Sequence, residues 1–119
     1  MWSVEMYETE SGEKPVEDFL LSLDKKMLAK ATTEIAILKE NGRNIGGAYS
    51  KYMKNGIFEL RIQVADNISR VFYFFYVGNR IILTNGFIKK TQKTPPRELE
   101  KALKYKQEYE RRMRQNAKL

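Results

Sequence analysis

Hydrophobic positions in the first third of the chain predict one strand followed by two helices. Residues 2–7 alternate between apolar and polar side chains, which is typical of a strand with one face on a core. Pro15 suits the first position of a helix because its missing N–H costs nothing there. Asp24 predicts the N-cap of a second helix that ends at Asn41-Gly42, and the short joint leads us to expect two antiparallel helices. The two apolar stripes are Val16, Phe19, Leu20 and Leu23, and Met27, Leu28, Ala31, Ile35 and Leu38.

From residue 51 the hydrophobic pattern changes to a period of two, which indicates strands. Turn residues separate the apolar runs, so consecutive strands are expected to pair as an antiparallel meander. The strands are expected at residues 57–64, 68–77 and 80–88, and a short further strand can form at 51–54.

The last segment predicts a helix, which completes an α+β fold of one domain over residues 1–119. Thr94 is expected to cap this helix, and Pro95-Pro96 opens it. The element order β-α-α-β-β-β-β-α predicts an antiparallel sheet with the two N-terminal helices packed on one side, and a C-terminal helix. The opposite sheet face is then expected to stay open to a ligand.

Two arginines on neighbouring strands give the first indication of a site. If Asp66-Asn67 forms a two-residue turn, Gln63 pairs with Arg70, and Arg61 lies on the same sheet face as Arg70. A three-residue turn would place the two arginines on opposite faces.

Charge and composition narrow the class of protein. The formal net charge is +7, but residues 1–50 hold 6 Lys/Arg against 9 Asp/Glu, whereas residues 51–119 hold 16 against 6. A basic field of this kind attracts polyanions such as nucleic acid. The chain has no cysteine, its first residues lack a basic segment, and no apolar run approaches the roughly 18 to 20 residues that a membrane helix needs. We therefore expect a soluble cytoplasmic protein with no membrane partner.

The absence of histidine and cysteine excludes several catalytic mechanisms. No His-assisted nucleophile, thiolate or zinc site of the usual ligands is available, and no glycine-rich phosphate loop is present. Carboxylates are sparse near the arginines, so neither a metal site nor a cofactor is expected. Arginine can bind phosphate and stabilise a phosphorane, and RNA brings its own nucleophile in the 2′-hydroxyl. Metal-free RNA cleavage is thus chemically feasible.

Each of these cations also has a structural interpretation. Arg61 can be half of an ion pair with Glu59. Arg70 lies in an otherwise apolar strand, where a charge is rarely tolerated without a partner or a ligand, so a functional role is favoured there. Lys89 and Lys90 lie where a strand ends and can simply be solvated.

Three motifs in order resemble a known family. They are Phe58-Glu59-Leu60-Arg61, Ser69-Arg70-Val71-Phe72-Tyr73-Phe74, and Gly86-Phe87-Ile88-Lys89-Lys90-Thr91-Gln92-Lys93-Thr94-Pro95, followed by a basic helix. With this spacing the chain resembles the phage-derived, HigB-like branch of the RelE/ParE toxin superfamily, and the resemblance covers nearly the whole chain.

The resemblance implies the toxin of a type II toxin–antitoxin pair, which cleaves mRNA in the A site of the 30S ribosomal subunit without a metal. A helix-turn-helix, HigA-like antitoxin is the implied protein partner. By motif, Arg70 matches the arginine that holds the scissile phosphate, and Lys89 and Lys90 match the basic pair that stabilises charge and protonates the leaving group. Arg61 and Lys54 match positions that add positive charge. The expected RNA contacts are Lys51, Lys54, Lys93 and Phe87.

The sequence also departs from better-known members of the superfamily. Some of them use a histidine or a tyrosine near the C-terminus as acid or base, whereas this chain has no histidine, and no motif places Tyr105 or Tyr109 at the site. Two alternatives remain open: a ParE-like toxin that inhibits DNA gyrase on the same fold, and a non-catalytic phage protein that binds nucleic acid.

Overall fold

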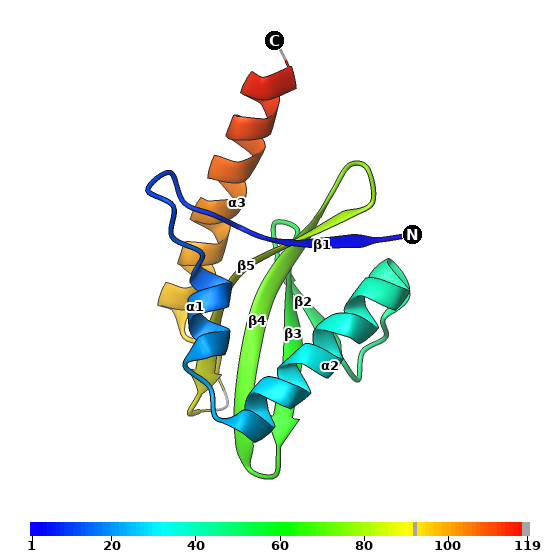
Figure 1. Cartoon of the computed structure of the whole chain (residues 1–119), viewed down its shortest axis with the longest axis vertical. Coiled ribbons are helices and arrows are strands. Elements are labelled where there is room, and N and C mark those ends of the chain that lie inside the picture. Colours follow the sequence, from blue (N-terminus) through cyan, green and yellow to red (C-terminus); the bar gives the residue numbers. More distant parts are fainter. Residues whose placement is uncertain (92, 118–119) are drawn as a thin grey trace.

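The computed structural model describes residues 1–91 and 93–117 as a five-stranded sheet with helices on both faces (Figure 1). The fold is α+β, as the sequence predicts. Within the described residues, no helix is both long enough and apolar enough to cross a bilayer. The elements are β1 (Ser3–Met6), α1 (Pro15–Leu21), α2 (Lys25–Asn41), the short 3₁₀ helix η1 (Gly42–Asn44), β2 (Ser50–Lys54), β3 (Ile57–Val64), β4 (Asn67–Tyr76), β5 (Arg80–Lys89) and α3 (Pro96–Ala117).

The sheet is mixed, with strand order β1-β5-β4-β3-β2. The expected antiparallel meander of β2 to β5 is present, but β1 pairs with β5 in parallel, with Ser3 opposite Arg80. The sheet is therefore mainly antiparallel, as expected, but the parallel pairing of β1 was not anticipated. No hairpin turn constrains the direction of β1, because two helices separate it from the other strands.

Helices α1 and α2 cover one sheet face, but they diverge from their joint instead of packing along each other as the expected antiparallel pair. Helix α1 packs mainly on β5 and α2 mainly on β3. Asp24 caps α2 as expected, because its carboxylate accepts a hydrogen bond of 2.8 Å from the N–H of Met27. Gly86 lets α1 approach β5 closely, since a Cβ there would lie 2.3 Å from the Phe19 ring.

Helix α3 packs on the other sheet face, so that face is not open along its whole length as expected. Ala102 and Tyr109 of α3 share a core with Phe72 and Phe74 of β4. In Figure 1, α3 runs along the sheet and its last turns project beyond it. The Tyr109 hydroxyl donates to Glu5 over 2.6 Å and thereby anchors the distal part of α3 beside β1. Toward the β3–β4 turn, Arg61 and Gln63 on this face remain exposed.

The β3–β4 turn lies one residue earlier than the sequence suggests. Val64 pairs with Asn67, so the turn residues are Ala65 and Asp66, and Ala65 takes a φ of +53°. Asp and Asn tolerate positive φ better than Ala, which is why the turn was expected at Asp66-Asn67. In the observed register, Phe58 lies opposite Tyr73 and the two rings stack at 5.5 Å.

The contact between α1 and β5 generates a stability prediction. Gly86→Ala forces a methyl group into the Phe19 ring and is expected to lower the free energy of unfolding by about 1–3 kcal/mol. Gly47→Ala is the matched control, because a Cβ at Gly47 meets nothing within 4 Å and needs no unusual φ. Urea denaturation followed by circular dichroism measures both. Equal stability of the two variants would contradict the close packing at Gly86.

Candidate functional site

Two arginines face each other on the sheet, toward the β3–β4 turn. Arg61 of β3 pairs directly with Arg70 of β4, so both side chains lie on the face that α3 covers elsewhere. The same-face expectation is confirmed, but the expected pairing of Gln63 with Arg70 is wrong, because Gln63 lies opposite Ile68. Like charges directly opposite each other destabilise a sheet, so this pair needs either compensation or a ligand.

Glu59 compensates the charge of Arg70. Its Oε1 lies 3.2 Å from Arg70 Nε, and both side chains are buried, with 2% and 9% exposure. The interpretation that Glu59 pairs with Arg61 is thus wrong, because Glu59 is engaged by Arg70 on the next strand. The Nε–H is not aligned for a hydrogen bond, so this contact is an ion pair.

Further contacts hold the ion pair in place. Arg70 Nη1 donates to the carbonyl of Ser69 over 2.9 Å, and Thr94 Oγ1 donates to Glu59 Oε2 over 2.7 Å. Thr94 uses its side chain for this contact and not for the expected helix cap. Arg70 Nη2 makes no hydrogen bond among the described residues, so its donors are available to a ligand.

The surroundings perturb the guanidinium of Arg70 in opposing ways. Burial lowers the pKa of Arg70 most strongly, the carboxylate of Glu59 raises it, and the nearby charge of Arg61 lowers it further. A guanidinium still remains protonated at neutral pH because its ordinary pKa is so high. Arg70 is therefore a fixed, partly desolvated cation, and electrostatic attraction to an anion is stronger there than in water.

Arg70 borders two adjoining hollows. One, of about 350 Å³, joins Arg70 to Lys89 and Lys90, and the other, of about 280 Å³, joins it to Arg61. Arg61 and Lys90 thus line different hollows, and Arg70 is the residue that the two hollows share. The first is also lined by Asp66, Ile68 and Thr91, and the second by Lys30, Glu34, Ala48, Tyr49 and Gln63.

The predicted RNA contacts are spread more widely. Lys51 is exposed on β2 opposite Glu59, which places it one strand away from the ion pair. Lys54 is opposite Ile57, toward the β2–β3 turn and away from Arg61. Lys93 is exposed in the segment that joins β5 to α3. Phe87 is only 7% exposed and packs on Phe72, so its ring offers little surface to a base.

The free cations of this surface suit an anion with several charges. Among the described residues, Arg61, Lys89 and Lys90 take part in no ion pair. No group of three or more potential acidic metal ligands occurs in the described part of the chain. The arrangement therefore offers cations to an anion in each of the two hollows beside Arg70.

Sequence reasoning did not identify several residues of this surface. Tyr49 and Gln63 line the hollow next to Arg61, and Thr94 supports Glu59 from the segment before α3. The alternation along β3 could have indicated Gln63, because this residue lies on the same face as Glu59 and Arg61. Tyr49 and Thr94 lie outside the strands, so no periodicity could place them.

The distal tyrosines lie in a different part of the fold. Tyr109 is buried, and its hydroxyl donates a hydrogen bond to Glu5. Burial raises the pKa of its phenol most strongly, and the hydrogen bond to Glu5 raises it further. Tyr105 stacks on Tyr7 at 4.6 Å. Both therefore anchor α3, and the structure gives them no contact with Arg70.

Comparison with known proteins identifies a family. No match is found among the curated proteins. The profile of the family described as phage-derived protein Gp49-like matches residues 18–107, which include both arginines and the Lys89-Lys90 pair. The chain therefore belongs to the phage-derived Gp49-like family, which is related to the RelE/HigB-type toxins.

Proposed function

We propose that this protein is the HigB-like toxin of a type II toxin–antitoxin system and that it cleaves mRNA on the ribosome without a metal. The observation that carries the proposal is the placement of Arg61 directly opposite Arg70, beside Lys89 and Lys90. A sheet that holds two arginines face to face gains from an anionic ligand between them. Family membership supports a toxin-related role.

In the proposed reaction, RNA supplies both the nucleophile and the leaving group. The 2′-hydroxyl loses its proton to solvent, and its oxygen forms a bond to the adjacent phosphorus. The P–O5′ bond then breaks, and the O5′ oxygen takes a proton from an ammonium of the Lys89–Lys90 pair. The products are a 2′,3′-cyclic phosphate and a 5′-hydroxyl, and DNA is resistant because it lacks the 2′-hydroxyl.

The arginines stabilise the charge that develops at phosphorus. Arg70 Nη2 donates to a nonbridging oxygen, while Glu59 and the Ser69 carbonyl fix the other guanidinium nitrogens. Such preorganised donors act more strongly on the phosphorane than on the starting diester. Glu59 is not free to act as a base, because Arg70 and Thr94 engage its two oxygens.

The proposed partners follow from the same surface. Exposed Lys51 and Lys93 extend the positive charge to either side of Arg70, as a polyanionic RNA requires. The 30S A site is the proposed place of cleavage, and a HigA-like helix-turn-helix antitoxin is the proposed neutralising protein in the cytoplasm. Mapping of mRNA 5′ ends after induction tests the activity, whereas DNA damage without mRNA cleavage would indicate gyrase inhibition.

The role of Arg70 generates the first functional prediction. Arg70→Lys keeps a charge beside Glu59 but loses the planar fork, so we expect cleavage to fall on the order of 10² to 10³-fold with partial retention of growth arrest. Arg70→Ala is expected to abolish both. Toxicity and 5′-end mapping at matched soluble expression measure the effect.

A second variant separates catalysis from folding. Arg70→Ala leaves Glu59 buried without its partner and can unfold the protein. Arg61→Ala is exposed, removes the like-charge contact and should not destabilise the fold, yet we expect it to slow cleavage by at least about tenfold. Lys104→Ala on the outer face of α3 is the control and should remain toxic. Full toxicity of folded Arg61→Ala and Arg70→Lys would refute the proposed site.

The support of Arg70 by Glu59 generates a prediction on stability. Glu59→Gln breaks a buried ion pair and is expected to cost on the order of 3 kcal/mol. Thr94→Val leaves a buried carboxylate oxygen without its donor and should cost about 1–3 kcal/mol, whereas Thr94→Ser restores the donor and the activity. Glu17→Gln disrupts a surface pair with Lys14 and should change stability by at most about 0.5 kcal/mol. Chemical denaturation with parallel cleavage assays distinguishes these cases, and a Thr94→Ser variant as impaired as Thr94→Val would contradict the role of the hydroxyl.

A further inference from the structure

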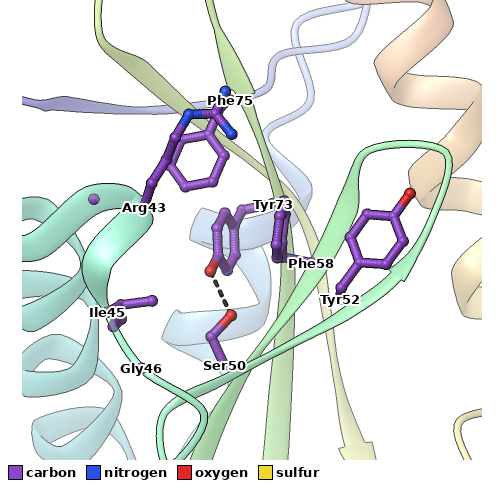
Figure 2. A pocket seen from close by; sticks show the side chains of 9 residues that line it. Arg43, Ile45, Gly46, Ser50, Tyr52, Phe58, Tyr73 and Phe75 are labelled. Atoms are coloured by element: carbon purple, nitrogen blue, oxygen red, sulfur yellow. Dashed lines mark hydrogen bonds between the residues drawn. The ribbon is translucent and has the colours of Figure 1, made fainter.

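A third concavity lies on the sheet face opposite Arg70, between β2 and the loop that follows α2. It has a volume of about 280 Å³ (Figure 2). Figure 2 shows four rings from three strands gathered around it, with an arginine from η1 at its rim. The side chains that matter are Tyr52, Phe58, Tyr73 and Phe75, together with Ser50 and Arg43.

The aromatic wall of this pocket is held in place by its own contacts. Phe58 stacks on Tyr73 at 5.5 Å and meets the edges of Tyr52 and Phe75 at 5.2 and 5.3 Å. Tyr73 is fully buried, and its hydroxyl bonds to Ser50, as Figure 2 shows. Rings fixed in this way do not lose further freedom when a ligand binds, so the pocket is preformed.

The loop that carries the arginine is fixed as well. Gly42 has a φ of +55°, and a Cβ there would lie 2.0 Å from the Trp2 indole, so the loop fits tightly against this ring. The next residue, Arg43, holds its guanidinium 4.2 Å from the centre of the Phe75 ring. Within the described residues, Arg43 forms neither an ion pair nor a side-chain hydrogen bond, so its donors are free for an acid at the rim.

The size and chemistry of the pocket select its occupant. Its volume lies just below the usual range for small-molecule sites, which suits a single aromatic group. We propose that the pocket binds one aromatic side chain of an acidic protein segment, with a neighbouring carboxylate on Arg43. Charge complementarity supports a carboxylate at the rim, because the guanidinium of Arg43 takes part in no ion pair among the described residues. Aromatic anchors in preformed pockets dominate the affinity of many interfaces.

A protein segment fits this pocket better than an RNA strand does. An RNA strand brings one negative charge with every nucleotide, whereas Arg43 is the only cation among the described residues that line this pocket. The cations suited to phosphates, such as Arg61, Arg70 and Lys89, lie on the other sheet face. The inference does not depend on the proposed RNA cleavage, and a partner docked here leaves the Arg70 surface uncovered.

Titration of the full-length protein with short blocked peptides tests the proposal. The probes are N-acetylated, C-amidated Asp-Trp-Asp, Asp-Ala-Asp and Lys-Trp-Lys, and binding is followed by amide chemical shifts. We expect Asp-Trp-Asp to shift the amides of Gly46 and Ser50, with Asp-Ala-Asp at least about tenfold weaker because the ring is lost. Lys-Trp-Lys should be several-fold weaker, because its charges repel Arg43.

Two exposed variants and one control complete the test. Arg43→Gln should remove the preference for aspartate over lysine flanks, and Tyr52→Ala, at a side chain that is 55% exposed, should weaken both tryptophan peptides. Arg97→Gln on α3 is the charge-matched control and should bind like the wild type. Circular dichroism melts confirm that each variant folds.

Several outcomes would overturn the proposal. Absence of shifts at the pocket at peptide concentrations on the order of 1 mM, or equal binding of Asp-Ala-Asp, would exclude an aromatic anchor. Displacement of Asp-Trp-Asp by a single-stranded RNA oligomer with shifts at Ser50 would assign the pocket to nucleic acid. Shifts at these amides on simple dilution would assign it to a second copy of the chain.

Discussion

The buried ion pair between Arg70 and Glu59 is the constraint on which the surrounding structure depends. A cation in the apolar strand β4 is costly unless an anion is buried with it, and Glu59 on β3 provides that anion at 3.2 Å. Thr94 then completes the coordination of the carboxylate from the segment that leads into α3. The segment that leads into α3 is thereby tied to the site.

The two faces of the sheet carry different surfaces, one cationic and one aromatic. On the α3 face, the core around Phe72 and Phe74 is followed along the sheet by the hollow that Arg61 and Arg70 line. On the other face, the core under α2 borders an aromatic pocket beside Arg43. Strand alternation makes this separation possible, because neighbouring residues of β3 such as Phe58 and Glu59 point to opposite sides. A ligand on one surface therefore does not exclude a ligand on the other.

Local patterns in the sequence predicted most of the elements, and distant contacts account for what they missed. Asp24 caps α2 as its position indicated, since capping involves only neighbouring residues. The parallel pairing of β1 with β5, and the use of Thr94 by Glu59, join residues far apart in the chain, which periodicity cannot reveal. The shared face of Arg61 and Arg70 could be predicted although the turn lies one residue earlier than expected. Moving a two-residue turn by one position shifts the pairing partners on β4 by two residues, and residues two apart in a strand point to the same face. The ion pair itself was assigned to the wrong arginine, because alternation specifies a face but not which neighbour on it makes contact.

The same pair of arginines links ligand binding to stability. Burial lowers the pKa of the Arg70 guanidinium most strongly, and the charge of Arg61 on the opposite strand lowers it further. The carboxylate of Glu59 outweighs the effect of Arg61 at Arg70, whereas Arg61 itself is exposed and takes part in no ion pair among the described residues. An anion bound between the two side chains interacts with both cations in the folded state alone, because the unfolded chain does not hold the arginines together. Binding of such an anion must therefore stabilise the fold.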